Sequence, residues 1–301
     1  MKIYNNLKID NKHKNSVVAI GNFDGIHKGH QKVIAQAKKK ANKKGLPFGI
    51  VTFEPVPVMF FNKKIKNHRI NSVNQKKFYL EKHKLNFLII VKFNKSFSKL
   101  KANDFIKKII YEKIKSKYIF VSKNFKFGKN RKGNIYTLKK QEKIFGYKTI
   151  ITSPLKKINK TISSTLIRNK ISYGRIEEAN SLLGRFWSIE GKVIRGKKRG
   201  RKIGFPTCNI KLDNYVVPKL GVYSIIAQSN KFRKKGIANV GLRPTFNGQN
   251  LLLEVNIFGL NENLYNKLLI VKFVKFLRPE KKFKNIIDLK KQIKIDVRKV
   301  K

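Results

Sequence analysis

Hydrophobic residues in the first half of the chain follow two patterns that alternate. Short continuous apolar runs, typical of buried strands, cover residues 17–20, 48–53, 85–93, 117–121 and 147–152. Between these runs, apolar residues recur at helical spacing over residues 31–44, 75–84, 102–114 and 134–145. Strands that alternate with helices form βαβ units, so residues 1–150 predict an α/β domain with a mainly parallel sheet.

The pattern changes after residue 151. Two short helical runs cover residues 165–169 and 177–183, and Gly184 ends the second one. Only strand-like runs separated by glycine turns follow for the next 90 residues. We therefore predict a domain boundary at Gly184–Arg185.

The second half predicts a different architecture. Six short strands are expected, over residues 188–194, 207–212, 221–227, 236–240, 251–258 and 268–276. Closely spaced short strands are typical of a small antiparallel β-barrel. A last amphipathic helix, residues 285–297, is expected to pack against the barrel with Ile286, Leu289, Ile293 and either Ile295 or Val297 on its apolar side.

The charge of the chain is strongly positive. Its 71 Lys and Arg residues against 16 Asp and Glu give a formal net charge of +55. However, only 12 of the basic residues are arginines, and the lysines are spread through every segment. Specific nucleic-acid recognition usually relies on arginine patches or interleaved aromatic residues, so we expect no specific nucleic-acid partner. A basic RNA- or DNA-binding protein on an α/β scaffold stays the alternative of a different class.

Cysteine content and hydropathy indicate the compartment. The single cysteine, Cys208, excludes an intramolecular disulfide and agrees with a reducing, cytoplasmic location. The first 14 residues have no apolar segment of a secretory signal, and no stretch approaches the roughly 20 apolar residues of a membrane span. We expect no membrane partner, and self-association stays open.

Residues 21–30, with the sequence GNFDGIHKGH, lie where the strand at 17–20 turns into a helix. In an open α/β sheet, ligands bind at such carboxyl ends of strands. A helix start presents N–H groups and the positive end of the helix dipole, which suit phosphate. The glycines let the backbone approach a ligand closely. The alternative is a tight turn with two solvated histidines.

The pattern around His27 and His30 resembles the signature of the HIGH-type nucleotidyltransferases, whose paired histidines hold the ATP phosphates during adenylyl transfer. Its longer form is similar to the N-terminal module of the bacterial bifunctional riboflavin kinase/FAD synthetases. The resemblance implies a Rossmann-like FMN adenylyltransferase domain over residues 1–184, with both histidines catalytic. The nucleotide-binding residues that it implies are Gly21, Phe23, Asp24 and Gly29.

Residues 162–168, ISSTLIR, give a second match. Serine and threonine at a helix start can cap the helix or bind phosphate oxygens, and an arginine adds a forked donor. Capping alone would explain the hydroxyl groups but not the arginine. In the family this motif grips the departing pyrophosphate, which implies that Ser163, Ser164 and Thr165 bind nucleotide and that Arg168 is catalytic.

Two further segments concern the flavin-binding side of the implied adenylyltransferase site. Residues 124–128, NFKFG, resemble a family segment there, which implies a binding role for Asn124. The alternative is a strand end with two core phenylalanines. After Pro55, Val56 and Val58 stand where the family usually has His and Arg. A chain that keeps the kinase but lacks the adenylyltransferase is therefore an alternative.

A glycine-rich basic loop precedes the sequence GFPTCN at residues 204–209. Such a loop is suited to cradling phosphates, and Thr207 and Asn209 offer oxygen ligands that Mg²⁺ accepts. The continuation is similar to that of riboflavin kinases, in which the Thr and Asn bind Mg–ATP. The resemblance implies a riboflavin kinase domain over residues 185–301. The ATP-binding residues that it implies are Gly196, Arg199, Gly204 and Pro206.

Two later segments complete the resemblance. Residues 238–246, ANVGLRPTF, match a family segment and imply a binding role for Arg243. Glu254 interrupts an apolar strand, and in the family this Glu is the base on the ribityl 5′-hydroxyl; Asn256 replaces the usual His. The resemblance over the whole chain implies two reactions: phosphorylation of riboflavin to FMN, and adenylyl transfer to FMN that gives FAD and pyrophosphate. It also implies ATP as co-substrate and Mg²⁺ as cofactor.

Overall fold

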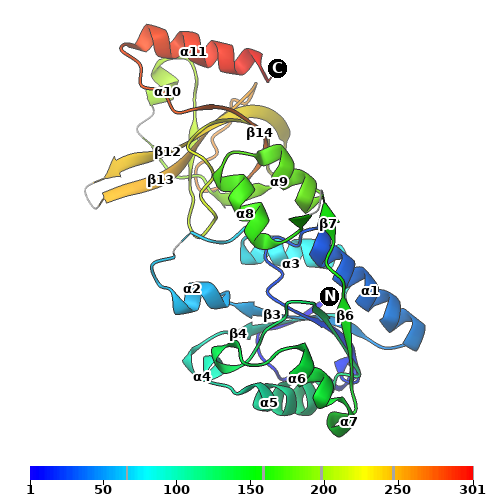
Figure 1. The fold of residues 1–301 in the computed structure, drawn as a ribbon. Coiled ribbons are helices and arrows are strands. Elements are labelled where there is room, and N and C mark those ends of the chain that lie inside the picture. The colour runs from blue at the N-terminus through cyan, green and yellow to red at the C-terminus, as the bar shows by residue number, and fades with distance from the viewer. Residues whose placement is uncertain (66, 158–159, 197–198, 246–247, 301) are drawn as a thin grey trace. The chain divides into compact units, whose positions relative to one another are not determined.

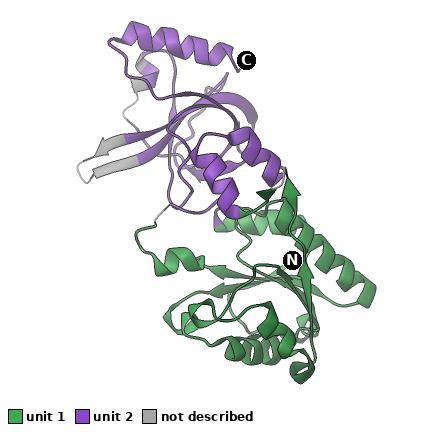
Figure 2. Ribbon diagram, in the orientation of Figure 1, with its two compact units in different colours: residues 1–66, 73–163 green, residues 67–72, 164–301 purple. Residues whose placement is uncertain are grey.

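The computed structural model describes residues 1–65, 67–157, 160–196, 199–245 and 248–300 (Figure 1). The chain forms two compact units (Figure 2). The first comprises Met1–Lys66 and Val73–Ser163, and the second comprises Asn67–Ser72 and Ser164–Lys301. The chain therefore enters the second unit twice.

The core of the first unit is a six-stranded sheet in the order β1-β4-β3-β2-β5-β6, in which all neighbours are parallel. Its strands are β1 (Lys2–Tyr4), β2 (Val17–Ile20), β3 (Phe48–Glu54), β4 (Phe87–Lys92), β5 (Tyr118–Ser122) and β6 (Lys148–Thr152). The predicted parallel sheet is confirmed, with β1 as an additional edge strand. From β2 the chain builds the sheet first on one side and then on the other, so the carboxyl end of β2 is the topological switch point.

Helices cover both faces of this sheet (Figure 1). One face is covered by α1 (Lys28–Lys44) and α3 (Val73–Glu81), whose buried residues share a core with β2 and β3. The other face is covered by α5 (Ala102–Asp104), its π-helical continuation Phe105–Ile114 and α6 (Ile135–Lys140). Because the strands β2, β3 and β4 lie between two apolar layers, their continuous hydrophobic runs are almost fully buried, whereas β6 at the edge of the sheet is only half-buried.

Shorter elements complete the first unit: α2 (Pro57–Phe61), α4 (Lys95–Ser98), α7 (Glu142–Phe145) and the hairpin of β7 (Lys156–Lys157) and β8 (Lys160–Thr161). The helix predicted over residues 134–145 is two helices, α6 and α7. The backbone opens between them at Gln141, where ψ is −1°, and the Glu142 side chain then accepts a hydrogen bond from the Thr149 N–H of β6.

The second unit is a six-stranded antiparallel barrel in the order β10-β13-β12-β11-β14-β9. Its strands are β9 (Ser188–Lys192), β10 (Cys208–Lys211), β11 (Gly221–Gln228), β12 (Arg233–Thr245), β13 (Gly248–Ile257) and β14 (Leu268–Pro279). The Ile194 N–H donates to the Asn209 carbonyl at 2.9 Å, which brings the chain after β9 against β10 and nearly closes the barrel. The predicted barrel is confirmed.

Helices α8 (Ser164–Ser172) and α9 (Ile176–Leu183) belong to the barrel unit. The Asn180 amide of α9 donates to the Phe273 carbonyl of β14 and accepts from the Trp187 N–H. The segment Asn67–Ser72, which we call the strap, adds to the same core because the Trp187 indole donates to the Ile70 carbonyl at 2.9 Å. The functional boundary at Gly184–Arg185 stays a prediction.

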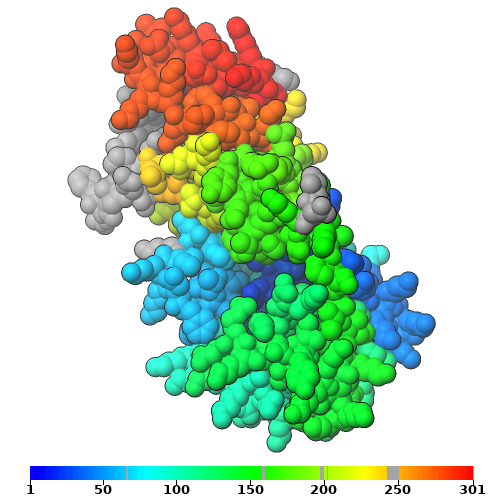
Figure 3. Space-filling model, viewed as in Figure 1, coloured from blue at the N-terminus to red at the C-terminus, as the bar shows by residue number. Residues whose placement is uncertain are grey.

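The C-terminal helix α11 (Ile286–Arg298) is tied to the barrel by a buried ion pair, while its apolar residues Leu289 and Ile293 are half-buried. Asp296, which is 1% exposed, forms an ion pair of 2.8 Å with Arg278 of β14, whereas Ile286 is 60% exposed. Figure 3 shows this helix, in red, on the surface. The expected packing through Ile286 is therefore wrong. Among the described residues, no helix combines the length and the apolar character needed to cross a bilayer.

Candidate functional site: the histidine loop and the barrel row

The loop between β2 and α1, residues 21–27, is held in an unusual conformation. Its backbone starts on the sheet, since the Gly21 N–H donates to the Val51 carbonyl of β3 at 3.1 Å. Phe23 and Ile26 then adopt positive φ values of 46° and 41°, which bulky side chains rarely do. Both side chains are almost fully buried, and this packing offsets a conformational cost of about 1–3 kcal/mol each. Such strain is typical of functional loops.

His27 and His30 are brought together at the start of α1. His27 caps the helix, and its Nδ1 accepts a hydrogen bond of 3.2 Å from the His30 N–H. The two rings stack with their centroids 3.7 Å apart. Because Nδ1 of His27 is the acceptor, the proton of its neutral ring sits on Nε2, which can donate to a phosphate oxygen. A Cβ at Gly29 would lie 3.1 Å from this ring, so the glycine leaves room for it.

The predicted Asn124 lies in a cavity of about 730 Å³ beyond the carboxyl end of β5. Arg131, Tyr136 and several lysines also line it, so the cavity combines positive charge with an aromatic ring. Phe125 lines the cavity and stacks on Phe127, which is buried in the core. Phe127 therefore belongs to the core, whereas Phe125 packs against that core and also lines the cavity.

The predicted pyrophosphate motif lies where the chain passes from one unit to the other. Ser163 is the last residue of the first unit, and Ser164 begins α8 in the second. One turn into the helix, an Arg168 Nη2 donates to the Thr165 hydroxyl at 3.4 Å. A phosphate that bound the hydroxyl group would therefore meet the guanidinium as well.

In the barrel, the glycine-rich loop packs on the predicted magnesium ligands. A Cβ at Gly196 would lie only 2.0 Å from the Asn209 amide nitrogen, and one at Gly200 would lie 3.2 Å from the Thr207 hydroxyl. Gly204 has a φ of 87°, which favours glycine. The loop therefore depends on glycine at Gly196, where the amide of Asn209 fills the space of a side chain.

Asn209, Glu254 and Asn239 form one row across three strands, which we call the barrel row. In the register, Asn209 of β10 lies opposite Glu254 of β13, and Glu254 lies opposite Asn239 of β12. Directly opposed residues of an antiparallel pair point to the same face of the sheet. The structure thus places the predicted base beside a predicted metal ligand. The side chains of Arg199 and Arg243 lie outside the described residues.

Comparison with known proteins identifies the family. Residues 9–166 match the family model described as FAD synthetase, and residues 183–301 match the one described as riboflavin kinase. The chain belongs to the bifunctional riboflavin kinase/FMN adenylyltransferases. A relative of that name from Buchnera aphidicola subsp. Schizaphis graminum is 40% identical over 99% of this chain and 96% of its own. The namesake from Bacillus subtilis is 38% identical over 93% of this chain and 90% of its own.

One solved structure is similar over the whole chain. It covers 99% of this chain and 97% of its own with a TM-score of 0.87 and 31% identity, and its title is "Crystal Structure of Macrolide-efflux Protein from Streptococcus pneumoniae". That title differs from the names of the relatives. The two family models together span both units, so the kinase and adenylyltransferase domains decide the assignment.

Asn256 departs from the usual residue of these bifunctional enzymes, and its structural role is clear. Its amide donates to the Pro206 carbonyl at 2.7 Å, which ties β13 to the loop before Thr207. Burial of the neighbouring Cys208 raises the pKa of its thiol to about 11. Cys208 is therefore a protonated packing residue near neutral pH.

Two further polar residues beside the predicted sites were not among the candidates named from the sequence. Lys76, on α3, is 2% exposed and reaches the Asn22 carbonyl of the histidine loop at 3.0 Å. Asn239 donates to Glu280 at 3.1 Å from its place in the barrel row. A helical lysine in a lysine-rich chain is unremarkable, whereas Asn239 lies in the matched segment 238–246 and could have been named from it.

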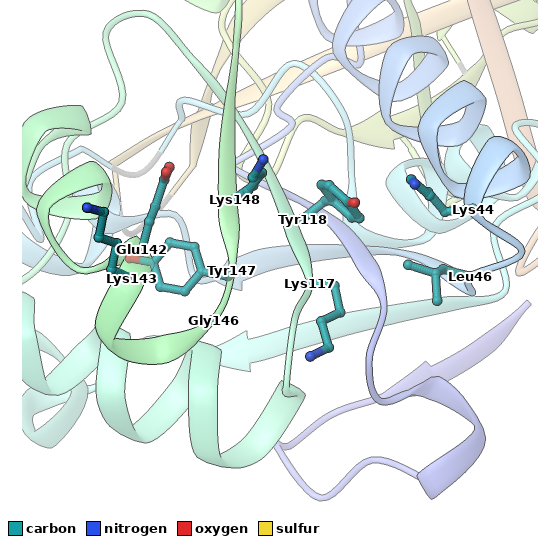
Figure 4. A pocket seen from close by; sticks show the side chains of 9 residues that line it. All are labelled: Lys44, Leu46, Lys117, Tyr118, Glu142, Lys143, Gly146, Tyr147 and Lys148. Atoms are coloured by element: carbon teal, nitrogen blue, oxygen red, sulfur yellow. The ribbon is translucent and has the colours of Figure 1, made fainter.

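A cavity of about 580 Å³ lies at the opposite, amino-terminal edge of the parallel sheet (Figure 4). Lys117, Tyr118 and Lys148, at the starts of β5 and β6, help to line it. None of the predicted site residues is part of this cavity.

Proposed function

We propose that the histidine loop carries the adenylyl transfer of this bifunctional enzyme. An oxygen of the FMN phosphate attacks the α-phosphorus of ATP, and the bond to the bridging oxygen breaks as pyrophosphate leaves. Such a step needs alignment and charge stabilisation more than covalent catalysis. His27 and His30 at the start of α1 supply donors, and the helix dipole favours the negative charge.

The cavity at Asn124 is proposed to receive FMN. Its aromatic residues Phe125 and Tyr136 suit the flavin ring, and Arg131 with the surrounding lysines suits its phosphate. Thr165 and Arg168 are proposed to hold the departing pyrophosphate, as their mutual hydrogen bond already pairs hydroxyl and guanidinium.

In the barrel, Glu254 is proposed as the base that takes the proton of the riboflavin 5′-hydroxyl while its oxygen attacks the γ-phosphorus of ATP. The barrel row carries this assignment, because it places Glu254 directly beside Asn209. Gly196, Gly204 and Pro206 belong to the loop that would cover the ATP phosphates.

The residues present fit a magnesium ion. Thr207 and Asn209 offer a hydroxyl oxygen and a carbonyl oxygen, the hard donors that Mg²⁺ prefers. In the Asn209 amide, the nitrogen lies next to Gly196, and the oxygen lies farther from that glycine. When bound with ATP, Mg²⁺ neutralises charge on the phosphate oxygens. Both reactions consume ATP, which fits a cytoplasmic enzyme. Self-association stays a prediction.

Glu254→Gln tests the proposal. The change preserves size and hydrogen bonding but removes the base, so riboflavin phosphorylation should fall about 10²–10⁴-fold while supplied FMN is still converted to FAD. Chromatography of the flavins separates both products. Binding of riboflavin and ATP should persist, since a merely structural carboxylate would lose binding as well. Kinase activity within a few-fold of wild type would show that Glu254 is not the base.

A further inference from the structure

Lys76 occupies a place where the fold calls for an apolar side chain. It lies on α3 one turn before Leu80, which is fully buried in the core shared by α1 and the sheet. Its own side chain is 3% exposed. A buried ammonium is costly unless hydrogen bonds and opposite charge compensate it. Packing alone therefore does not explain why a lysine occupies this buried position.

The ammonium of Lys76 binds the loop that carries the two histidines. Its Nζ donates to the Asn22 carbonyl at 3.0 Å, and the Thr52 hydroxyl of β3 donates to the same carbonyl at 3.0 Å. Two donors from different elements thus converge on one peptide. Because a peptide unit is planar, fixing its carbonyl also fixes the direction of the following N–H, that of Phe23. Phe23 is one of the two strained residues of the loop.

A carboxylate lies near the same ammonium. Glu54, at the end of β3, lies 3.8 Å from Nζ, beyond hydrogen-bond distance, and its side chain is 20% exposed. The ammonium therefore holds the Asn22 carbonyl through a direct hydrogen bond, whereas Glu54 interacts with it over a longer distance.

We propose that Lys76 is a positioning residue for adenylyl transfer: its buried ammonium fixes the Asn22 peptide, and through it the loop that holds His27 and His30. The inference rests on the proposed role of the histidine loop. It predicts that a change at Lys76 lowers the rate of FAD formation and leaves the rate of riboflavin phosphorylation unchanged.

Lys76→Met in the full chain is the direct test, with Lys77→Met as the matched control. Lys77 is the next residue of the same helix and only half-buried. Loss of a hydrogen bond to a charged group corresponds to about 10–100-fold, so kcat for FAD formation from FMN should fall by that factor. The KM for FMN should stay within about twofold, and FMN formation from riboflavin should be unchanged. Lys77→Met should match wild type in both reactions.

The double variant Lys76→Met with Glu54→Gln separates positioning from charge balance. It removes both charges of the Lys76–Glu54 pair, so its melting temperature should return toward wild type while kcat for FAD formation stays low. Recovery of kcat in the double variant would mean that Lys76 only balances Glu54, and it would overturn the proposal. So would a Lys76→Met enzyme within threefold of wild type, or the failure of both variants to fold.

His30→Ala distinguishes this inference from the proposed function. If Lys76→Met is active while His30→Ala is not, the histidine loop keeps its role and only the role of Lys76 fails. If His30→Ala forms FAD at the wild-type rate, the proposed site itself is wrong.

Discussion

Gly196→Ala should disable the kinase through one methyl group. The added Cβ would lie 2.0 Å from the amide nitrogen and 3.1 Å from the Cγ of Asn209. Real Cβ atoms essentially never come closer than 3.0 Å to such an atom, so the contact with the nitrogen is not possible without a shift. The Asn209 backbone is held by the hydrogen bond from the Ile194 N–H. The side chain of Asn209 must therefore turn away, and its oxygen leaves the barrel row by about 1 Å or more. Misplacement of that size can cost about 10²-fold in rate.

The assay follows FMN and FAD by chromatography over a range of Mg²⁺ concentrations. We expect riboflavin phosphorylation to fall about 10²-fold, and conversion of supplied FMN to FAD to stay unchanged. Lys192→Ala, an exposed position on β9, serves as the control and should match wild type. If Gly196→Ala phosphorylates riboflavin within threefold of wild type at low Mg²⁺, Asn209 does not act from the position described.

Three further predictions concern the other site, the boundary and the cysteine. His30→Ala should lower FAD formation about 10²–10³-fold and leave FMN formation intact, measured on the same chromatograms; equal FAD rates would make His30 a turn residue. Fragments 164–301 and 186–301 should both phosphorylate riboflavin. The shorter fragment should melt at a lower temperature, because it lacks α8 and α9 and with them the hydrogen bonds of Asn180 to Trp187 and β14. A folded but inactive fragment 186–301 would contradict the boundary. Burial raises the pKa of Cys208 to about 11, so its thiol stays protonated at pH 8. Alkylation of the thiol should therefore be about 10²-fold slower in the folded chain than in the urea-unfolded chain. Equal alkylation rates would show that the thiol is exposed.

Periodicity determined most of the architecture because it reports burial directly. Continuous apolar runs became the parallel strands, and the regularly spaced apolar residues of α1 became its buried face. Short strands with glycine turns became the barrel. These elements bury one dominant face each, so local sequence suffices to predict them.

Elements whose positions depend on remote partners escaped this reasoning. β1 has three residues and is defined by its pairing with β4. The helix α11 also forms a buried ion pair between Asp296 and Arg278 of β14, which the spacing of its apolar residues does not indicate. Periodicity cannot register a contact that forms between segments far apart in the chain.

The same division holds for the sites. The motifs named His27, His30, Thr207, Asn209 and Glu254 because their residue types and spacing carry chemistry. Only the tertiary structure showed that Glu254 lies between Asn209 and Asn239, because strand register is a property of the assembled sheet. Likewise, Lys76 differs from the other lysines only in its burial against the Asn22 peptide, and burial of one residue in a lysine-rich helix is decided by what the fold packs against it.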